Sequence, residues 1–216
     1  MTQSRILYDY DKKTTHLKAD GVTEGAVDWP DSSSLAQPVT QEQRDRFGLA
    51  FFGTANLATV PGARSITLDI FGILTLGLAQ TRFSVLKNRP LTGEVTSRSF
   101  GFGFDLGTTT TVSGVAYDYQ TDTNHLIDAR DHAVELNEAF LSQVTPGEPW
   151  DLNDNGRADE ILSGDGGLTA AMDAFGTLTL SRTRTDYRVL KGRALAGDVT
   201  LRTQTRGFDG TKTLTQ

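Results

Sequence analysis

"FGILTLGLAQTRFSVLKNRPLTGEVTSR", residues 71–98, predicts a pair of antiparallel β-strands. The stretch is rich in β-branched and aromatic residues, and it lacks the apolar spacing of three and four residues that marks a surface helix. Its central "KNRPLTG" contains residues typical of turns, so we expect a hairpin there. Pro90 has no amide proton to donate, so it fits a loop or an edge strand but not a central strand.

The same stretch occurs a second time in the chain. "FGILTL" at Phe71 recurs as "FGTLTL" at Phe175, and "VLKNRPLTGEVTSR" at Val85 recurs as "VLKGRALAGDVTLR" at Val189, both 104 residues later. Chance is a poor explanation for several colinear matches. We therefore interpret the sequence as two copies of one unit of about 105 residues.

A further match lies upstream, at a spacing of 109 residues. "ILYDYDKKTTHL", which begins at Ile6, resembles "VAYDYQTDTNHL", and the match pairs His16 with His125. We predict a first repeat unit over residues 1–110 and a second over residues 111–216. The final "GTKTLTQ" would be continued by the opening "MTQSRILYDY", so either the chain is a two-repeat piece of a longer array or copies join end to end between molecules. We favour the first explanation, because terminal repeats of arrays are usually atypical.

The predicted fold class is mainly β, with tandem β-sandwich or barrel-like units that each carry one short helix. In the second copy Leu178 and Leu180 alternate with Thr and Ser, which is the two-residue period of a strand. The helices are expected at residues 40–51, capped by Thr40, and at residues 131–144. A doubly wound sheet is disfavoured, because regular alternation of strands and helices is absent.

The composition excludes several classes of function. The net charge is −6 and the basic residues are dispersed among acidic ones, which does not fit a nucleic-acid-binding surface. The chain has no cysteine, so disulfides, thiolate zinc sites and cysteine nucleophiles are excluded. No stretch approaches the roughly 18 apolar residues of a membrane span, and the N-terminal sequence lacks the apolar core of a signal peptide.

"DLNDNGRADEIL", residues 151–162, has the residue pattern of a calcium-binding loop. Oxygen-bearing side chains at alternate positions can wrap around a hard cation, and Gly156 permits the sharp turn between them. The expected Ca²⁺ ligands are four side chains and one main-chain carbonyl, namely Asp151, Asn153, Asn155 and Asp159, and the carbonyl of Arg157. The alternative is a solvated turn, because Asp, Asn and Gly are also the residues that turns prefer.

This loop resembles the calcium loops of EF-hands, dockerins and the FG-GAP blades of integrin-like propellers, and the resemblance covers only these residues. It departs from the EF-hand pattern at Leu162, where the bidentate glutamate would stand. The shorter pattern that ends at Asp159 is closer to the FG-GAP form. The corresponding part of the first copy, "FGLAFFGTAN", offers almost no anionic ligand, so the resemblance implies one structural ion for the two copies.

Four aromatic residues are candidates for ligand contact: Trp29, Trp150, Tyr117 and Tyr119. A loop tryptophan or a pair of strand tyrosines can stack on a carbohydrate or anchor a partner, although packing within the fold is the commoner role. His16 and His125 have no partners at zinc-ligand spacing, so we interpret them as surface or core histidines. The sequence shows no catalytic constellation, and no catalytic residue is predicted.

These patterns favour a non-enzymatic, calcium-stabilised repeat protein of an extracellular or cell-surface assembly, such as an adhesin or a filament. Its expected partners are other copies of the repeat or cell-surface molecules, carbohydrate among them, and neither nucleic acid nor a membrane span is expected. One alternative is a pseudo-symmetric β-barrel enzyme or small-ligand carrier formed by the two halves. A further alternative is a carbohydrate-binding module. Because one fold serves many functions, the alternatives stay open at this point.

Overall fold

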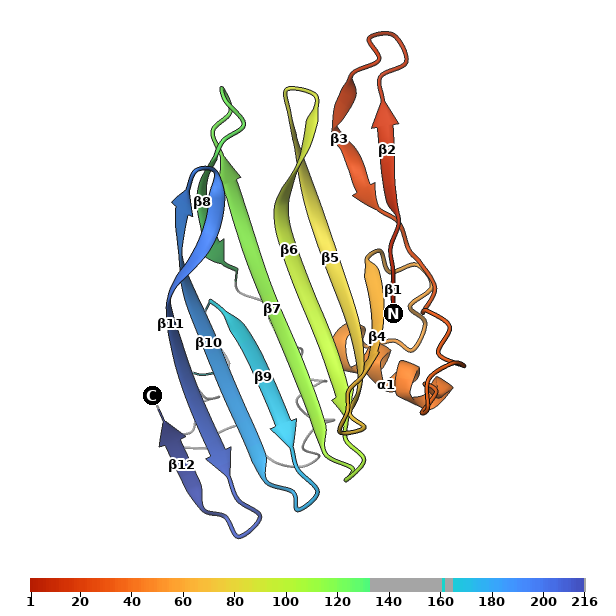
Figure 1. Cartoon of the computed structure of the whole chain (residues 1–216), viewed down its shortest axis with the longest axis vertical. Coiled ribbons are helices and arrows are strands. Elements are labelled where there is room, and N and C mark those ends of the chain that lie inside the picture. The colour runs from red at the N-terminus through yellow and green to blue at the C-terminus, as the bar shows by residue number, and fades with distance from the viewer. Residues whose placement is uncertain (133–160, 162–164, 216) are drawn as a thin grey trace.

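The computed structural model describes residues 1–132, 161 and 165–215 and is mainly β, which confirms that part of the predicted fold class (Figure 1). It contains the following elements: β1 (Thr2–Gln3), β2 (Ile6–Tyr10), β3 (Leu17–Glu24), α1 (Gln41–Phe52), β4 (Ala63–Leu68), β5 (Leu74–Leu86), β6 (Arg89–Phe102), β7 (Thr108–Tyr119), β8 (Leu126–Asp131), β9 (Gly167–Met172), β10 (Leu178–Leu190), β11 (Arg193–Arg206) and β12 (Lys212–Thr215).

Ten of the described strands form one antiparallel sheet in the order β1-β4-β5-β6-β7-β8-β10-β11-β12, with β9 between β7 and β10. β8 and β9 share one place in this sheet. β9 pairs with the first half of β7, at Thr108–Val112, and β8 pairs with the second half, at Val115–Tyr119. β2 and β3 form a separate two-stranded sheet, which lies beside the upper part of β5 in Figure 1.

The two predicted hairpins are present, and their bounds differ by the 104 residues that separate the sequence copies. β5–β6 runs from Leu74 to Phe102, and β10–β11 runs from Leu178 to Arg206. The end pairs Leu74↔Phe102 and Leu178↔Arg206 correspond directly. The units of residues 1–110 and 111–216 remain an interpretation of the sequence, and in the structure β7 crosses the boundary between them.

Both hairpin turns are tighter than the sequence suggests. Only two residues connect the strands, Lys87–Asn88 in the first hairpin and Lys191–Gly192 in the second, and all four have positive φ, between 48° and 74°. This is the left-handed geometry of a type I′ turn, whose twist matches that of the flanking strands. Pro90 therefore lies within β6, opposite Val85, at a point where β7 does not pair with β6. Its missing amide proton is tolerated because this end of β6 is an edge.

The helix predicted at residues 40–51 is confirmed as α1. The side chain of Thr40 accepts a hydrogen bond of 3.2 Å from the amide of Gln43, and the Gln43 side chain accepts one of 2.9 Å from the amide of Thr40. This reciprocal pair is a capping box. Gly48 lies inside the helix at a position where a larger residue would clash, because a Cβ there would lie 2.4 Å from the carbonyl oxygen of Thr54. Of the helix expected at 131–144, residues 133–144 lie outside the described part, and Asp131 ends β8.

The larger hydrophobic core of the described residues extends from the first hairpin to the second. In the first five residues of β5 and of β10, every second residue is buried and the intervening residues are half-buried, as the two-residue period predicts. α1 contributes Phe47, which is fully buried, to this core. The buried members are Val39, Phe47, Ala50, Leu57, Ile66, Leu74, Leu76, Leu78, Phe100, Ile161, Ala170, Leu178 and Leu180. The two sequence copies therefore stabilise one shared interior.

Candidate interaction surfaces

The predicted calcium loop lies outside the described residues except for Ile161, near its end. Ile161 is buried, and its carbonyl oxygen accepts a hydrogen bond of 2.6 Å from Nε of Arg182. Arg182 also donates through Nη1 to the carbonyl oxygen of Gly166, at 3.2 Å. β10 thus holds the chain just after Asp159, the last predicted ligand, and again before β9.

The first copy contains the same kind of attachment. Arg64 of β4 donates through Nη2 to the carbonyl oxygens of Leu57 and Val60, the latter at 3.2 Å. Leu57 precedes Ile161 by the same 104 residues that separate the sequence copies. Burial lowers the pKa of both Arg64 and Arg182. In each copy, a buried arginine ties the segment before β4 or β9 to the sheet.

The predicted ligands Asp151, Asn153, Asn155, Arg157 and Asp159 all lie within residues 133–160, outside the described part of the chain. In the part that is described, no group of three or more His, Asp or Glu side chains could hold a metal ion. The calcium site therefore remains a prediction from the sequence.

Trp29 lies at the margin of the core. Its ring meets the ring of Phe47 edge-on, with centroids 5.2 Å apart, and the guanidinium carbon of Arg64 lies 5.6 Å from the centroid of the Trp29 ring. Trp29 is half-buried and packs against the core, so its described contacts are those of a packing residue. Trp150 lies outside the described residues.

Tyr117 and Tyr119 lie in β7, and both are half-buried. Burial raises the pKa of Tyr119, and the nearby Tyr117 raises it further. Their sequence counterparts Tyr8 and Tyr10, in β2, are exposed. Ligand contact by the β7 pair remains a prediction. The tyrosines of β7, inside the large sheet, are therefore more buried than the corresponding tyrosines of β2, in the two-stranded sheet.

His16 and His125 lie at the ends of equivalent loops. The amide of Asp11 donates to the carbonyl oxygen of His16, and the amide of Gln120 donates to that of His125, both at 2.8 Å. Both imidazoles are on the surface. A third histidine, His132, has Nε2 3.2 Å from Oε1 of Glu94.

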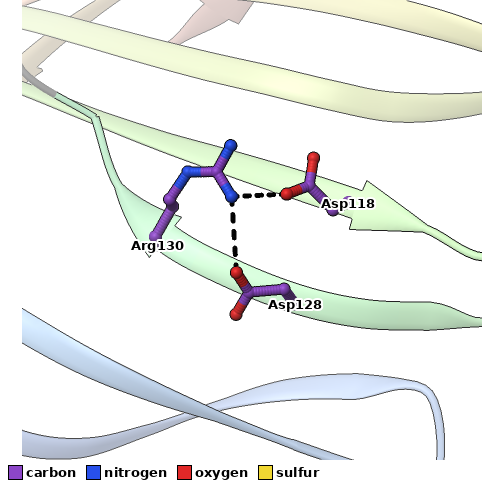
Figure 2. A network of polar contacts seen from close by, with 3 residues as sticks. All are labelled: Asp118, Asp128 and Arg130. Atoms are coloured by element: carbon purple, nitrogen blue, oxygen red, sulfur yellow. Dashed lines mark hydrogen bonds and ion pairs between the residues drawn. The ribbon is translucent and has the colours of Figure 1, made fainter.

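An exposed polar network joins β7 and β8 (Figure 2). Nη1 of Arg130 contacts Oδ2 of Asp118, and it lies 3.3 Å from Oδ2 of Asp128. The two carboxylates raise the pKa of Arg130, Asp118 more strongly than Asp128. Asp131, at the end of β8, accepts a 2.5 Å hydrogen bond from the amide of Thr185 and so links β8 to β10. These carboxylates have structural partners.

Aspartate-stabilised turns connect the strands at the lower end of the sheet in Figure 1. Oδ1 of Asp69 accepts hydrogen bonds from the amides of Phe71 and Ile73 at 2.8 and 2.9 Å. In the second copy, Oδ1 of Asp173 accepts from the amides of Phe175 and Thr177 at 2.9 and 2.8 Å. The carboxylate accepts hydrogen bonds from turn amides that have no backbone carbonyl within reach.

Each turn at this end displays a phenylalanine to solvent. Phe71, Phe104, Phe175 and Phe208 are 70%, 77%, 79% and 79% exposed. Four exposed aromatic rings at the same end of the sheet mark a candidate contact surface. The sequence reasoning missed it, although the repeated "FG" and "GFD" motifs placed these rings next to turn residues.

A second surface is the edge of the sheet at β11. β11 pairs with β10 from Arg193 to Arg206, but with β12 only from Thr203 to Arg206. Within the described chain, residues 198–202 of β11 therefore have a strand on one side only. An open strand edge presents unpaired amide and carbonyl groups and can accept another strand.

A groove of about 450 Å³ lies between β3 and the β5–β6 hairpin. Charged side chains of both signs line it, among them Asp20, Glu24, Arg82 and Glu94.

Comparison with known proteins gives no family for this chain: no family model, no curated protein and no solved structure matches it. None of the described helices is long and apolar enough to cross a membrane.

Proposed function

We propose that the protein is a non-enzymatic, calcium-stabilised structural unit of an extracellular or cell-surface assembly of the adhesin or filament type. One observation carries the proposal: hairpins β5–β6 and β10–β11 have the same register and lie in one sheet, joined through β7. In repeat proteins, neighbouring units bury a common core and stack in one direction. The shared core under both hairpins supports this kind of architecture.

The role of β7 supports a structural function in particular. β7 pairs with β6 along Thr108–Ala116, and it also pairs with β8 and β9. Backbone hydrogen bonds link β7 directly to the first hairpin and, through β8 and β9, to β10 of the second. This pairing fixes the relative orientation of the hairpins, which a flexible linker would not do. A fixed orientation is what an extended assembly needs from each of its units.

The polar residues of the described surface also favour a structural role. Asp118 and Asp128 contact Arg130, and Asp69 and Asp173 hold turns. A catalytic carboxylate pair would instead point its oxygens at a substrate pocket.

Calcium enters the proposal through the loop at residues 151–162. A Ca²⁺ ion that binds only the folded state raises the free energy of unfolding by about 2.7 kcal/mol at a hundredfold excess over its dissociation constant. Because Arg182 fixes Ile161, the loop leaves from a defined point on the sheet, so an ion there would stiffen the second copy.

Thermal unfolding with calcium and with a chelator tests the proposal. We expect calcium to raise the Tm of the intact chain, and Asp151→Ala to abolish the shift. Asp186→Ala, which removes an exposed acid of β10, is the matched control and should keep the shift. An unchanged Tm with and without calcium would remove the ion from the proposal.

A second candidate is a binding module for a small polar ligand such as a carbohydrate. The charged groove between β3 and β5–β6 favours it. Glycan-array binding that is lost in Arg82→Ala would support this function, and an array without signal would count against it.

A further inference from the structure

The free edge of β11 has an occupied counterpart inside the same molecule. Residues 94–98 of β6 correspond to residues 198–202 of β11, and β7 pairs with them. The pairs run from Glu94↔Ala116 to Arg98↔Val112. At β11 no strand of the described chain takes the place that β7 takes on β6.

Among the described residues, the N-terminal segment also has one strand edge without a partner. β1 pairs with β4, β2 pairs with β3, and between them the amide of Gly25 donates to the carbonyl oxygen of Arg5 at 3.0 Å. One edge of residues 1–7 is therefore used, and no described strand pairs with the other edge. β7 has the same arrangement on one side, where β9 and β8 pair with it, but its other edge is covered by β6.

The register shows which residues correspond. Thr2 pairs with Ser65, and Thr111 of β7 pairs with Thr169 of β9. Ser65 and Thr169 are 104 residues apart, and Thr2 and Thr111 are 109 apart, as in the sequence matches. β1 thus occupies the position on β4 that residues 111–112 occupy on β9. The N-terminal segment therefore corresponds to β7, but no described strand pairs with it in the way that β6 pairs with β7.

We propose that a second copy of this chain adds its segment Gln3–Leu7 antiparallel to residues 198–202 of β11, in the register that β7 has on β6. This register places Ile6 of the second copy opposite Val199, and Gln3 opposite Arg202. The inference rests on the proposed function, because it names the partner of the structural unit as another copy of itself.

The apolar side chains at the two edges fit each other. In this register Ile6, which is 43% exposed, lies opposite Val199 and diagonal to Leu201, which are 59% and 52% exposed. Inside the molecule, the corresponding pair Val95↔Val115 is half-buried, so the pairing would cover apolar surface that now faces water.

Opposite charges also meet in this register. Asp198 would lie opposite Leu7 and diagonal to Arg5 on the same face of the sheet. Diagonal neighbours in antiparallel strands are within reach of long side chains, and opposite charges there are favourable. A shift by one residue would place Val199 and Ile6 on different faces, so the apolar match excludes that shift.

The resulting contact joins two different surfaces, the β11 edge of one copy and the N-terminal edge of the next. Such a heterologous contact leaves both kinds of edge open at the ends of a dimer, and it continues into a chain of copies unless the rotation closes a ring. The product is an extended sheet filament.

Disulfide trapping tests this pairing, because the chain has no cysteine of its own. Directly opposite residues of antiparallel strands have Cα atoms roughly 4.5–5.5 Å apart, which a disulfide can bridge. Val199→Cys and Ile6→Cys are made in separate chains, mixed and mildly oxidised. Thr200→Cys replaces Val199→Cys in the matched control, because residue 200 points to the other face.

We expect a disulfide-linked heterodimer of Val199→Cys with Ile6→Cys at a yield at least about tenfold above that of the Thr200→Cys control with Ile6→Cys, as the face and distance requirements dictate. A single chain that carries both Val199→Cys and Ile6→Cys should give a ladder of oligomers on a non-reducing gel. Circular dichroism of each variant confirms folding.

Equal yields from Val199→Cys and Thr200→Cys with Ile6→Cys, or no cross-link from either, would overturn the pairing. The calcium-dependent shift in Tm is measured on the same wild-type chain. If that shift persists without cross-linking, the pairing fails while the structural-unit proposal stands; if the shift is absent while the specific cross-link forms, calcium fails and the pairing stands.

Discussion

Arg182 of β10 lies directly opposite Leu168 of β9, and the same pair occurs between β4 and β5 with the residue types exchanged, as Arg64 opposite Leu78. Both arginines are buried, and both donate to the carbonyl oxygen of the corresponding residue in the preceding segment, Ile161 or Leu57. The attachment is therefore common to both copies, although the strand that supplies the guanidinium differs.

Arg182→Leu is expected to lower the free energy of unfolding by about 2–4 kcal/mol, because it leaves the buried carbonyl oxygens of Ile161 and Gly166 without this donor. The double variant Leu168→Arg with Arg182→Leu copies the arrangement of β4 and β5. It should recover a large part of that loss, and urea unfolding of the four proteins in the cycle measures the coupling. Additive effects of the two changes would contradict the equivalence of the two sites.

Lys191→Asn is expected to raise the free energy of unfolding by about 0.5–1 kcal/mol. Lys191 has φ 51° and Gly192 has φ 74°, and Asn-Gly is the sequence that type I′ turns prefer. Lys191→Gln is the control, because glutamine removes the charge without favouring positive φ. Urea unfolding that finds no difference between Asn and Gln would show that backbone strain at this turn is negligible.

Acid should loosen the turn at Asp173. Hydrogen bonds from the amide of Thr177, and a further one from Phe175, hold the pKa of the Asp173 carboxyl below its usual range. A folded-state pKa below the unfolded value stabilises the protein above the usual carboxyl pKa, and this contribution is lost as the pH falls through the lower folded value, below about pH 4. Carbon-detected NMR titration should find the lowered pKa directly.

Asp173→Asn is the companion variant for the acid prediction. The asparagine amide does not ionise. The free energy of unfolding of this variant should therefore fall less with acid than that of the wild type. An identical fall in Tm with acid for wild type and Asp173→Asn would contradict the assignment.

The local features of the fold were predictable from the sequence because they depend on neighbouring residues. The strand alternation around Leu178, the hairpins and the capping box at Thr40 are of this kind. The sequence predicts Pro90 in a turn or an edge strand. Pro90 lies in β6, at an end that β7 does not reach, because the pairing of β7 with β6 begins only at Glu94. This position depends on the length of β7.

Other features depend on packing between distant parts of the chain. The exchange of arginine and leucine between β4–β5 and β9–β10 hides the shared position from a residue-by-residue match, since Arg64 aligns with Leu168 and Leu78 with Arg182. The shared place of β8 and β9 beside β7 likewise follows only from the pairing. Exposure of the turn phenylalanines was missed because an apolar residue in a strand-rich chain is normally assigned to the core.

Hydrogen exchange on a tandem fusion tests most directly the claim that the sheet extends from unit to unit. Joining Thr215 of one copy to Gln3 of the next creates a strand that corresponds to β7, read by mass spectrometry against the single chain. We expect slower amide exchange at residues 198–202 of the first copy and residues 4–7 of the second, with residues 94–98 unchanged. Exchange at both segments as fast as in the single chain would contradict the extension of the sheet.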